Sequence, residues 1–196
     1  MSDHHDHEHV AVEDRVRALE SLLVEKGITR TETIDRVLNL VEGDIGPLLG
    51  ARIAARAWLD SDFRARLLAD APAACAELGI DAGNLAVVEN RPGLHNVVCC
   101  TLCSCYPWKV LGLPPTWYKS PAYRSRIVIE PRAVLRELGC HLPADTAIRV
   151  WDSSSEMRYM VLPERPDGTE SLSENDLIAL VSRDVLLGVA TIPSRA

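Results

Sequence analysis

The chain contains 196 residues, of which 47% are hydrophobic and 25% are charged, and its formal net charge at pH 7 is -7. This composition is ordinary for a globular protein and excludes collagen-like, low-complexity and disordered chains. The acidic charge argues against nucleic acid and anionic membrane surfaces as partners, because both are bound through excess Lys and Arg. Charged residues also interrupt every apolar run well before the roughly 18 residues that a membrane-spanning helix needs.

Residues 1–10 are acidic and rich in histidine, and they contain no apolar stretch of the kind found in secretory signals. We expect this segment to be a disordered tail and the protein to be cytoplasmic. Thiols stay reduced in that compartment, so the six cysteines are expected to be buried, metal-bound or catalytic rather than paired in disulfides. Four of the six lie between Cys99 and Cys105, which makes this segment the main signal in the sequence.

The first part of the chain reads as a series of helices. Apolar residues recur at helical spacing over residues 12–26 and again over residues 31–42, and a glycine follows each segment. Residues 48–69 predict a third helix that is broken near Asp60. Pro72 fits the first turn of a short helix that ends at Gly79. We therefore expect a helical N-terminal arm over residues 11–80.

The pattern changes after Gly79, where short β-branched runs alternate with turn residues. These runs predict strands at residues 85–88, 96–100 and 127–129, and a hairpin-like pair at residues 148–151 and 158–162. Residues 131–138 and 173–182 predict helices, the second of which begins with a capping box between Ser173 and Asp176. The prediction is an α+β metal-binding catalytic domain over residues 81–196.

Three cysteines provide a candidate metal site. Cys100, Cys103 and Cys105 lie on one tight turn after a predicted strand, and a Cys-x-x-Cys spacing can direct two sulfurs to a single ion. A structural zinc site, however, needs four side-chain ligands. No second cysteine pair matches the first, and a fourth ligand would have to come from one of three more distant residues, Cys140, His141 and His95.

Backbone nitrogen offers another way to complete the site. The thiols of Cys103 and Cys105 flank two amide nitrogens, and if these amides lose their protons the four atoms can occupy one plane around a metal. Cys100 then caps the ion axially, and the sixth octahedral position stays open for water or substrate, as a Lewis-acid catalyst requires. Amide ligands demand a strongly polarising ion, such as trivalent cobalt or iron.

This cysteine motif closely resembles that of the α subunit of nitrile hydratase. The resemblance covers nearly the whole chain and also rests on residues 40–50, 55–58, 88–90, 111–115, 117–120, 123–126, 150–153 and 156–166. It implies an α+β fold in which a helical N-terminal arm wraps a partner chain. A layered α-β-β-α domain then presents residues 100–105, which we name the claw loop, at the interface between the subunits.

The resemblance also implies a low-spin, non-corrin Co(III) or Fe(III) centre and no organic cofactor. Its ligands are three sulfurs and two amide nitrogens, those of Cys100, Cys103 and Cys105 and those of Ser104 and Cys105. In the family the residues that match Cys103 and Cys105 are oxidised to sulfinic and sulfenic acid, respectively. Thr101 and Tyr106 follow the cobalt-type form of the motif, so we expect cobalt.

The implied reaction is hydration of a nitrile to the corresponding amide. The metal polarises the carbon–nitrogen triple bond, and the sulfenate oxygen of Cys105, or a water that it activates, attacks the nitrile carbon. Oxidised Cys103 and Cys105 need cationic hydrogen-bond partners, which in the family are arginines of a β subunit. The α chain alone is therefore expected to be inactive, and a dedicated activator protein is expected to deliver the cobalt.

Four further residues are candidates for the substrate pocket or its support. Trp108 follows the claw loop and is expected in the pocket wall, although a core position is the alternative. Glu156 and Arg158 match family positions that form hydrogen bonds around the pocket, but a cross-strand ion pair would give the same sequence pattern. Asp81 lies near a position that is often glutamine in the family, and Lys109 replaces a common proline.

Other polar residues are assigned to packing. Cys99 replaces the usual aliphatic residue before the claw loop, and strand alternation is expected to point its side chain away from Cys100, as a buried hydrophobe. Binding of metal by Cys99 in the wrong geometry, or an adventitious disulfide, is the competing possibility. His95 is expected to be a hydrogen-bonded structural histidine, and Cys140 and His141 are expected to pack.

Two alternative functions stay open. The cobalt-bearing subunit of thiocyanate hydrolase carries the same claw motif, although it is usually longer at the N-terminus. Nitrile hydratases for heterocyclic nitriles such as toyocamycin also share the motif and divide the β partner into two chains, so the sequence does not identify the nitrile. From another class, a non-catalytic thiolate module would hold zinc through unmodified cysteines.

Overall fold

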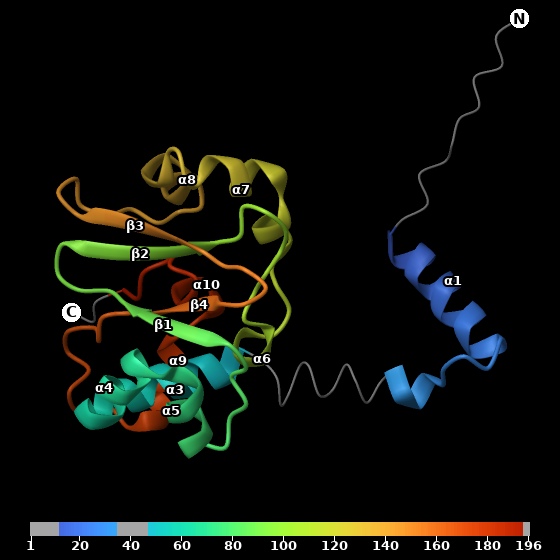
Figure 1. Ribbon diagram of the computed structural model, residues 1–196, viewed down its shortest axis with the longest axis horizontal. Coiled ribbons are helices and arrows are strands. Elements are labelled where there is room, and N and C mark those ends of the chain that lie inside the picture. The colour runs from blue at the N-terminus through green and yellow to red at the C-terminus, as the bar shows by residue number, and fades with distance from the viewer. Residues whose placement is uncertain (1–11, 35–46, 194–196) are drawn as a thin grey trace, which may run out of the picture. The chain divides into compact units, whose positions relative to one another are not determined.

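The computed structural model describes residues 12–34 and 47–193. The chain divides into two compact units, Met1–Val41 and Glu42–Ala196 (Figure 1). In the first unit, α1 (Val12–Glu25) confirms the predicted helix at residues 12–26. It ends where Gly27 adopts a φ of +68°, a left-handed conformation that glycine accepts without strain. Residues 31–34 are helical, whereas the rest of the second predicted helix and the predicted tail at residues 1–10 lie outside the described residues.

The second unit begins with three helices, α3 (Pro47–Leu59), α4 (Ser61–Ala69) and α5 (Ala71–Glu77). The predicted break near Asp60 is confirmed. Asp60 caps α4, because its Oδ1 accepts hydrogen bonds from the main-chain N–H groups of Asp62 and Phe63 at 3.0 and 2.9 Å. Asp70 caps α5 in the same way, through the main-chain N–H of Ala73.

These three helices belong to the core of the second unit, and the predicted division at residue 80 is therefore wrong. Helix α3 packs against α9 (Glu174–Leu180), and α4 and α5 pack against β1 (Leu85–Glu89). Their buried residues, among them Ala54, Leu67 and Cys75, form one hydrophobic cluster with residues of the strands. Apolar periodicity identified the helices but not the surface on which they pack, so the predicted arm was too long.

The strands form two parallel pairs. Strand β1 pairs with β4 (Arg158–Leu162), and β2 (Leu94–Cys99) pairs with β3 (Ala147–Asp152). The predicted hairpin between β3 and β4 is therefore wrong, although both strands exist. Met160, Val161 and Leu162 are all buried, which fits a strand covered on both faces rather than one arm of a half-exposed hairpin.

The strand predicted at residues 127–129 is also wrong. These residues form a turn after α7 (Pro121–Arg126), in which the Ile127 N–H bonds to the Tyr123 carbonyl and the Ile129 N–H bonds to that of Arg126. Ile127 is buried, whereas Ile129 is 80% exposed. Helix-type hydrogen bonds and one anchoring side chain outweigh the β propensity of the three residues.

The remaining helical elements of the described chain are short. They are α6 (Trp108–Leu111), the 3₁₀ turn η2 (Thr116–Lys119), α8 (Pro131–Glu137), α9 and α10 (Arg183–Leu186). The predicted helices at residues 131–138 and 173–182 are confirmed, and so is the capping box between Ser173 and Asp176. None of the helices in the described ranges is long and apolar enough to cross a membrane.

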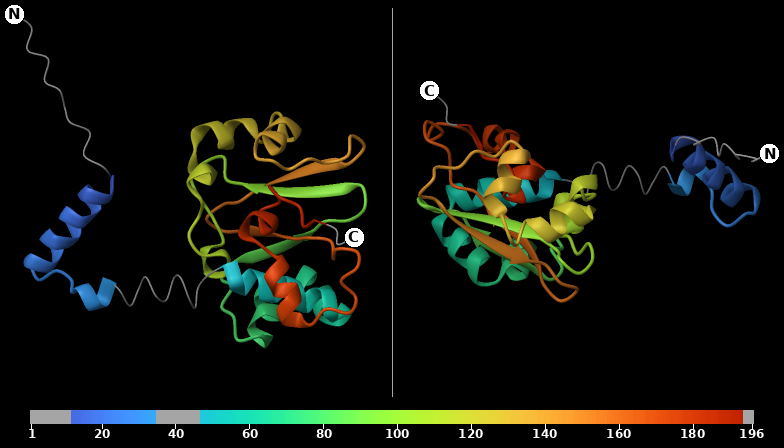
Figure 2. Two further views of the ribbon diagram at one scale, coloured as in Figure 1. Left: turned by 180° about the vertical axis from the view of Figure 1, so that it is seen from behind. Right: turned by 90° about the horizontal axis from the view of Figure 1, so that it is seen from above.

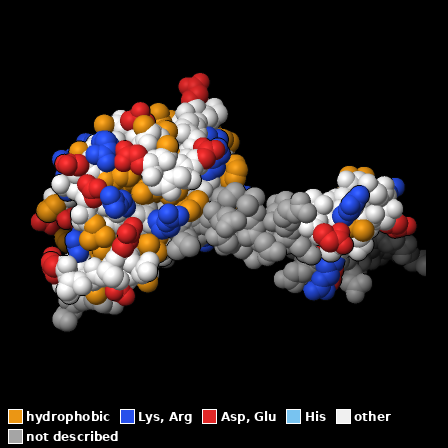
Figure 3. All heavy atoms as spheres, turned by 90° about the horizontal axis from the view of Figure 1, so that it is seen from below, with side chains coloured by type: hydrophobic (Ala, Val, Ile, Leu, Met, Phe, Trp, Pro, Cys, Tyr) orange, Lys and Arg blue, Asp and Glu red, His pale blue; other side chains and the backbone are white. Residues whose placement is uncertain are grey.

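In Figures 1 and 2, helices α3, α4, α5 and α9 gather beside the β1–β4 pair, and α7 and α8 lie beside β3. Contacts between β2 and β4 join the two strand pairs. The mixed helix and strand class is thus confirmed, whereas the specific α-β-β-α layering stays a prediction. On the face shown in Figure 3, acidic and basic side chains are interspersed with hydrophobic ones.

Candidate metal centre

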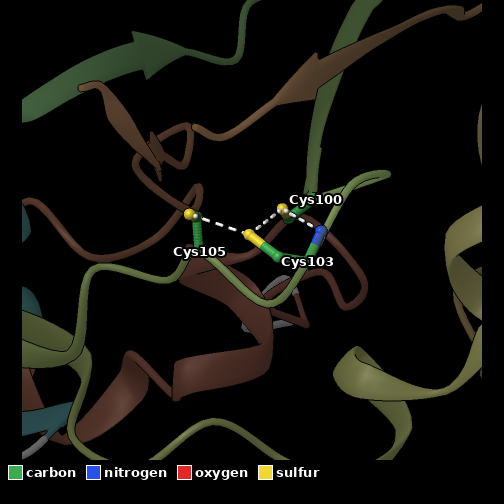
Figure 4. A group of neighbouring side chains, drawn as sticks. All are labelled: Cys100, Cys103 and Cys105. Atoms are coloured by element: carbon green, nitrogen blue, oxygen red, sulfur yellow. Dashed lines mark hydrogen bonds between the residues drawn. The ribbon is translucent and has the colours of Figure 1, made fainter. Parts of the chain in front are cut away.

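The claw loop brings three sulfur atoms together. The Sγ of Cys103 lies 3.4 Å from the Sγ of Cys100 and 3.1 Å from that of Cys105 (Figure 4). The main-chain N–H of Cys103 also donates to the Cys100 sulfur at 3.3 Å. Within residues 12–34 and 47–193, this is the only convergence of three or more His, Cys, Asp or Glu donors. The predicted sulfur ligands are therefore adjacent in space.

The loop is positioned by the end of β2. Cys99 is the last residue of β2, Cys100 is buried directly after it, and Pro107 precedes the first residue of α6. Between these two anchors Cys103 is exposed and Cys105 is half-buried. The loop is thus buried at Cys100, which we call its base, and open to solvent at Cys103 and Cys105, which we call its open side.

The thiols differ in acidity. Hydrogen bonds from Cys105 and then from Cys100 lower the pKa of the Cys103 thiol to about 7, and the main-chain amides of Cys105 and Ser104 add to this effect. The hydrogen bond between the Cys103 and Cys105 sulfurs has the opposite effect on Cys105 and raises the pKa of its thiol to about 11. Cys103 is therefore the first of this pair to become a thiolate, the form that binds metal and is oxidised.

The donor set distinguishes between the two kinds of metal site. A fourth side-chain ligand of the kind that structural zinc needs does not approach the three sulfurs within the described chain. The claw loop does, in contrast, contain the main-chain amides of Ser104 and Cys105, which contribute to the lowered pKa of the Cys103 thiol. Three converging sulfurs, with the amide groups of Ser104 and Cys105 next to them in the chain, therefore fit an ion that accepts backbone nitrogen.

Thr101 is held from two sides. Its main-chain N–H and its hydroxyl donate to the two carboxylate oxygens of Asp152, at 2.8 and 2.5 Å. On the other side, Arg124 donates from Nε to the carbonyl oxygen of Cys100 at 3.0 Å and from Nη2 to that of Thr101 at 2.8 Å. The start of the claw loop is thereby fixed by β3 and by α7.

Two buried tyrosines hold other carbonyl groups of the same segment. The Tyr123 hydroxyl donates to the carbonyl oxygen of Val98 at 2.7 Å, and the Tyr118 hydroxyl donates to that of Cys105 at 2.9 Å. The Tyr118 ring packs edge-on against Tyr106. Residues 118–124 thus contact the main chain on both sides of the three sulfurs.

The other predicted site residues do not join the sulfur cluster. Trp108 is the first residue of α6 and is 46% exposed. Asp81 is exposed and forms an ion pair with Lys109. Both residues differ from those common in the family at these positions, and the ion pair links the two differences. This hydrogen bond from Lys109 is the main reason that the pKa of the Asp81 carboxyl is lowered.

Glu156 and Arg158 do not form the cross-strand ion pair that was one reading of the sequence. Glu156 lies in the loop before β4, where its main-chain N–H bonds to the Ser154 hydroxyl. The Arg158 guanidinium instead donates to the side-chain oxygen of Asn84, and its buried Nε has no hydrogen-bond partner among the described residues. Their expected role at the pocket remains a prediction.

The packing assignments are largely confirmed. Cys99 is fully buried, burial raises the pKa of its thiol to about 12, and its sulfur is outside the cluster. His95 is buried between the Asn90 side chain and the Gly188 carbonyl oxygen, 2.7 Å from its Nε2, and burial lowers its pKa. Cys140 is buried as expected, but His141 is exposed, so the packing role predicted for His141 is wrong.

Sequence reasoning assigned no role to Arg124, Asp152, Tyr118 or Tyr123. All four lie in segments that were noted for their family resemblance, at residues 117–120, 123–126 and 150–153. Their contacts with the claw loop depend on tertiary structure. Asp152 is opposite Cys99 only because β2 and β3 pair in parallel, and the sequence suggested no such pairing.

Comparison with known proteins gives consistent matches. The family described as nitrile hydratase, alpha chain, matches residues 10–190. The low-molecular-weight cobalt-containing nitrile hydratase subunit alpha of Rhodococcus rhodochrous is 54% identical over 187 residues, covering 93% of this chain and 90% of that protein. Thiocyanate hydrolase subunit gamma of Thiobacillus thioparus is 42% identical over 187 residues, covering 88% of this chain and 76% of that protein.

A solved structure agrees with these matches. A double mutant of the Fe-type nitrile hydratase from Comamonas testosteroni Ni1 has a TM-score of 0.82 and 43% sequence identity, covering 94% of this chain and 95% of that chain. The family match spans the claw loop, all four strands and the helices of the second unit. The chain therefore belongs to the nitrile hydratase alpha-chain family.

Proposed function

We propose that this chain is the metal-bearing α subunit of a nitrile hydratase, a hydro-lyase that adds water across the triple bond of a nitrile to give the amide. The convergence of the Cys100, Cys103 and Cys105 sulfurs, with the Ser104 and Cys105 amides beside them, carries the proposal. Family membership over residues 10–190 supports it.

The three sulfurs and the amide nitrogens of Ser104 and Cys105 would hold the metal. Once bound, a trivalent ion there supplies Lewis-acid polarisation of the nitrile. We propose low-spin, non-corrin Co(III), because Thr101 and Tyr106 follow the cobalt-type motif and the Rhodococcus rhodochrous relative is cobalt-containing. Fe(III) is the alternative, since the Comamonas testosteroni protein is an Fe-type enzyme. No organic cofactor is proposed.

The chain's own oxidised cysteines would then activate the water that adds to the nitrile. In this proposal Cys103 carries a sulfinic and Cys105 a sulfenic group, so that oxygen atoms replace bare sulfur at the open side of the loop. The Cys105 oxygen would remove a proton from a water that attacks the nitrile carbon, and both protons of that water would pass to the nitrile nitrogen to complete the amide. If the Cys105 oxygen instead attacked the carbon itself, a water would then have to replace the transferred oxygen on sulfur, which would supply the two protons, release the amide and restore the sulfenate. Arg124, Asp152 and Tyr118 keep the loop in place during these steps.

A partner is part of the proposal. Leu102, within the claw loop, is 86% exposed, and Trp108, six residues further along the chain, is also exposed. Large apolar side chains in such positions are typical of a surface that another chain covers. We propose that one or two β chains cover it and supply cations to the sulfur oxyanions, and that an activator protein inserts the cobalt. A cytoplasmic location stays a prediction.

The substrate pocket is proposed to include Trp108, with Asp81, Glu156 and Arg158 in supporting positions. The nitrile itself is unassigned, because a small aliphatic nitrile and a nucleoside nitrile require the same chemistry at the metal. Comparing the kcat/KM values of the parent and of Trp108→Ala for a small and a bulky nitrile tests the pocket assignment. Equal effects on both substrates would argue against a wall position for Trp108.

Thiocyanate hydrolase is the rival enzyme. Two observations favour nitrile hydratase over it. The identity is 54% to the Rhodococcus rhodochrous nitrile hydratase subunit but 42% to the thiocyanate hydrolase subunit, and the chain covers 90% of the first protein but only 76% of the second. A zinc module is less favoured still, because no fourth side-chain donor joins the three sulfurs among the residues that the structure describes, which leaves zinc incompletely bound.

The deciding experiment expresses the chain with its β partner and activator protein in cobalt medium. We expect a complex that contains cobalt, releases amide from a nitrile and carries two added oxygen atoms on Cys103 and one on Cys105 by mass spectrometry. Release of carbonyl sulfide from thiocyanate would instead identify the rival enzyme. A catalytically silent complex with zinc and unmodified cysteines would identify the thiolate module.

A further inference from the structure

We propose that Arg124 is a positioning residue of the metal centre, which fixes the main chain at Cys100 and Thr101 and offsets the negative charge of the loaded claw loop. The inference rests on the proposed function and assigns a role to a residue of this chain rather than of the partner. Its basis is the pair of hydrogen bonds from one guanidinium to two consecutive carbonyl groups, at 3.0 and 2.8 Å.

The geometry of these bonds suits an arginine and no other side chain. The planar guanidinium presents Nε and Nη2 as a rigid fork, so both carbonyl oxygens are held in one fixed relation. One carbonyl belongs to Cys100, the buried ligand at the base of the loop. A rotation of the Cys100 peptide would move the chain that carries the other ligands, and the fork opposes this rotation.

Asp152 completes the restraint from the opposite side. It accepts hydrogen bonds from the N–H and the hydroxyl of Thr101, whose carbonyl oxygen is bonded to Arg124. Both ends of Thr101 are therefore fixed, and neither bond can shift without straining the other. Helix α7 supplies Arg124, and β3 supplies Asp152, so two separate elements determine the position of one residue next to a metal ligand.

Charge gives Arg124 a second effect. Thiolate, sulfur oxyanion and deprotonated amide ligands together outnumber the positive charges of a trivalent ion, so the loaded loop is anionic. Among the described residues, Arg124 is the only cationic side chain that donates hydrogen bonds to the main chain of the loop, and it forms no ion pair with a described carboxylate. Its charge is consequently available to the loop.

Helix α7 also contains a matched control. Arg126 lies two residues further along the same helix and is, like Arg124, half-buried. Its guanidinium donates to Glu130 and Glu137, and it forms no hydrogen bond with the claw loop. Arg126→Gln therefore removes the same charge and the same number of side-chain atoms from the same helix, but leaves the loop restraints intact.

The test compares Arg124→Gln, Arg124→Lys and Arg126→Gln with the parent, each purified as the complex from cobalt medium. The readouts are cobalt per α chain, the sulfur-to-cobalt charge-transfer band, the melting temperature and nitrile turnover. For Arg124→Gln we expect cobalt content to fall several-fold, the band of the loaded fraction to shift and kcat to fall by about tenfold or more. Arg126→Gln should match the parent in band and cobalt content.

Arg124→Lys separates the two effects, because lysine keeps the charge but loses the fork. We expect cobalt content between those of the parent and of Arg124→Gln, together with a shifted band. If Arg124→Gln retains parental cobalt content and an unshifted band, the positioning role is refuted, even if its melting temperature falls. If Arg124→Gln does not accumulate, a parent-like band and cobalt content in Arg124→Lys refute the role instead.

The two proposals fail in different ways. A parent complex that binds no cobalt and releases no amide contradicts the proposed function, whatever the variants do. A parent complex that is active and cobalt-loaded, beside an Arg124→Gln complex with the same spectrum and cobalt content, contradicts only the role of Arg124.

Discussion

The hydroxyl of Tyr118 donates a hydrogen bond to the main-chain carbonyl oxygen of Cys105, over 2.9 Å. Tyr118 is fully buried, and burial raises the pKa of its hydroxyl far above the ordinary range, so the group stays a neutral donor. The bond links a residue of η2 to the last cysteine of the claw loop. The main chain of the loop is therefore restrained at its end as well as at its start.

Removing this bond should weaken the end of the loop without disturbing the core. For Tyr118→Phe we expect a loss of about 1 kcal/mol in the free energy of unfolding, because a partly buried carbonyl loses its partner while the ring stays packed. Denaturant titration of the complex measures this loss. Tyr159→Phe is the control, since the Tyr159 hydroxyl has no hydrogen-bond partner among the described residues and its ring stacks near Trp151. Equal losses in the two variants would contradict the prediction.

The pH dependence of stability should carry a contribution from His95. Burial lowers the pKa of His95 below its ordinary value of 6.5, so the folded state holds the ring neutral while the unfolded state protonates more readily. The unfolded state thus binds more protons as the pH falls below about 6.5, and stability is lost over that range. The full contribution is present at higher pH, where both states are neutral.

Melting curves of the complex between about pH 5 and pH 7.5 test this contribution. His95→Gln should have a lower melting temperature at neutral pH, because its hydrogen bonds to Asn90 and to Gly188 are altered, but a flatter pH dependence than the parent. His141→Gln, at an exposed site, should follow the parental curve. A parental slope in His95→Gln would exclude His95 as its source.

Local signals accounted for the parts of the fold that the sequence predicted well. The break between α3 and α4 follows from the capping side chain of Asp60, and the start of α9 follows from Ser173 and Asp176, which satisfy each other within four residues. The spacing of Cys100, Cys103 and Cys105 likewise brings three sulfurs together through one turn. In each case the partners are close in the sequence.

Most of the failures concern partners that are distant in the sequence. The alternation that identified β3 and β4 contains no information on which strand lies beside them, and both pair in parallel with earlier strands. The isoleucines at 127 and 129 have high strand propensity, but helical hydrogen bonds after α7 determine their conformation. Arg124 and Asp152 reach the claw loop across 23 and 51 residues from Thr101, so neither role follows from a local pattern.

The chain that follows α10 approaches β2 closely, and this approach depends on one glycine. Gly188 has a φ of +77°, and a Cβ built on it would lie 2.0 Å from the carbonyl oxygen of Asn96. Gly188→Ala should therefore lower the free energy of unfolding by more than about 2 kcal/mol, because left-handed strain adds to a clash with backbone. Gly79→Ala is the control for strain alone, since Gly79 has a φ of +72° and no atom within 4 Å of such a Cβ. Equal losses in a denaturant titration would exclude the clash.

The extra cysteine beside the claw loop should be dispensable for the metal. Cys99 is buried, and its thiol, with a pKa raised to about 12 by burial, stays protonated where Cys103 ionises. We expect Cys99→Val to keep the parental cobalt content and turnover, because valine fills a similar volume and the three converging sulfurs are untouched. Cys103→Ala, in contrast, should lose most of its cobalt, because the sulfur between the other two is removed. Metal analysis of both complexes, purified side by side from cobalt medium, measures the difference. A lower cobalt content in Cys99→Val than in the parent would show that Cys99 takes part in the site and is not only a packing residue.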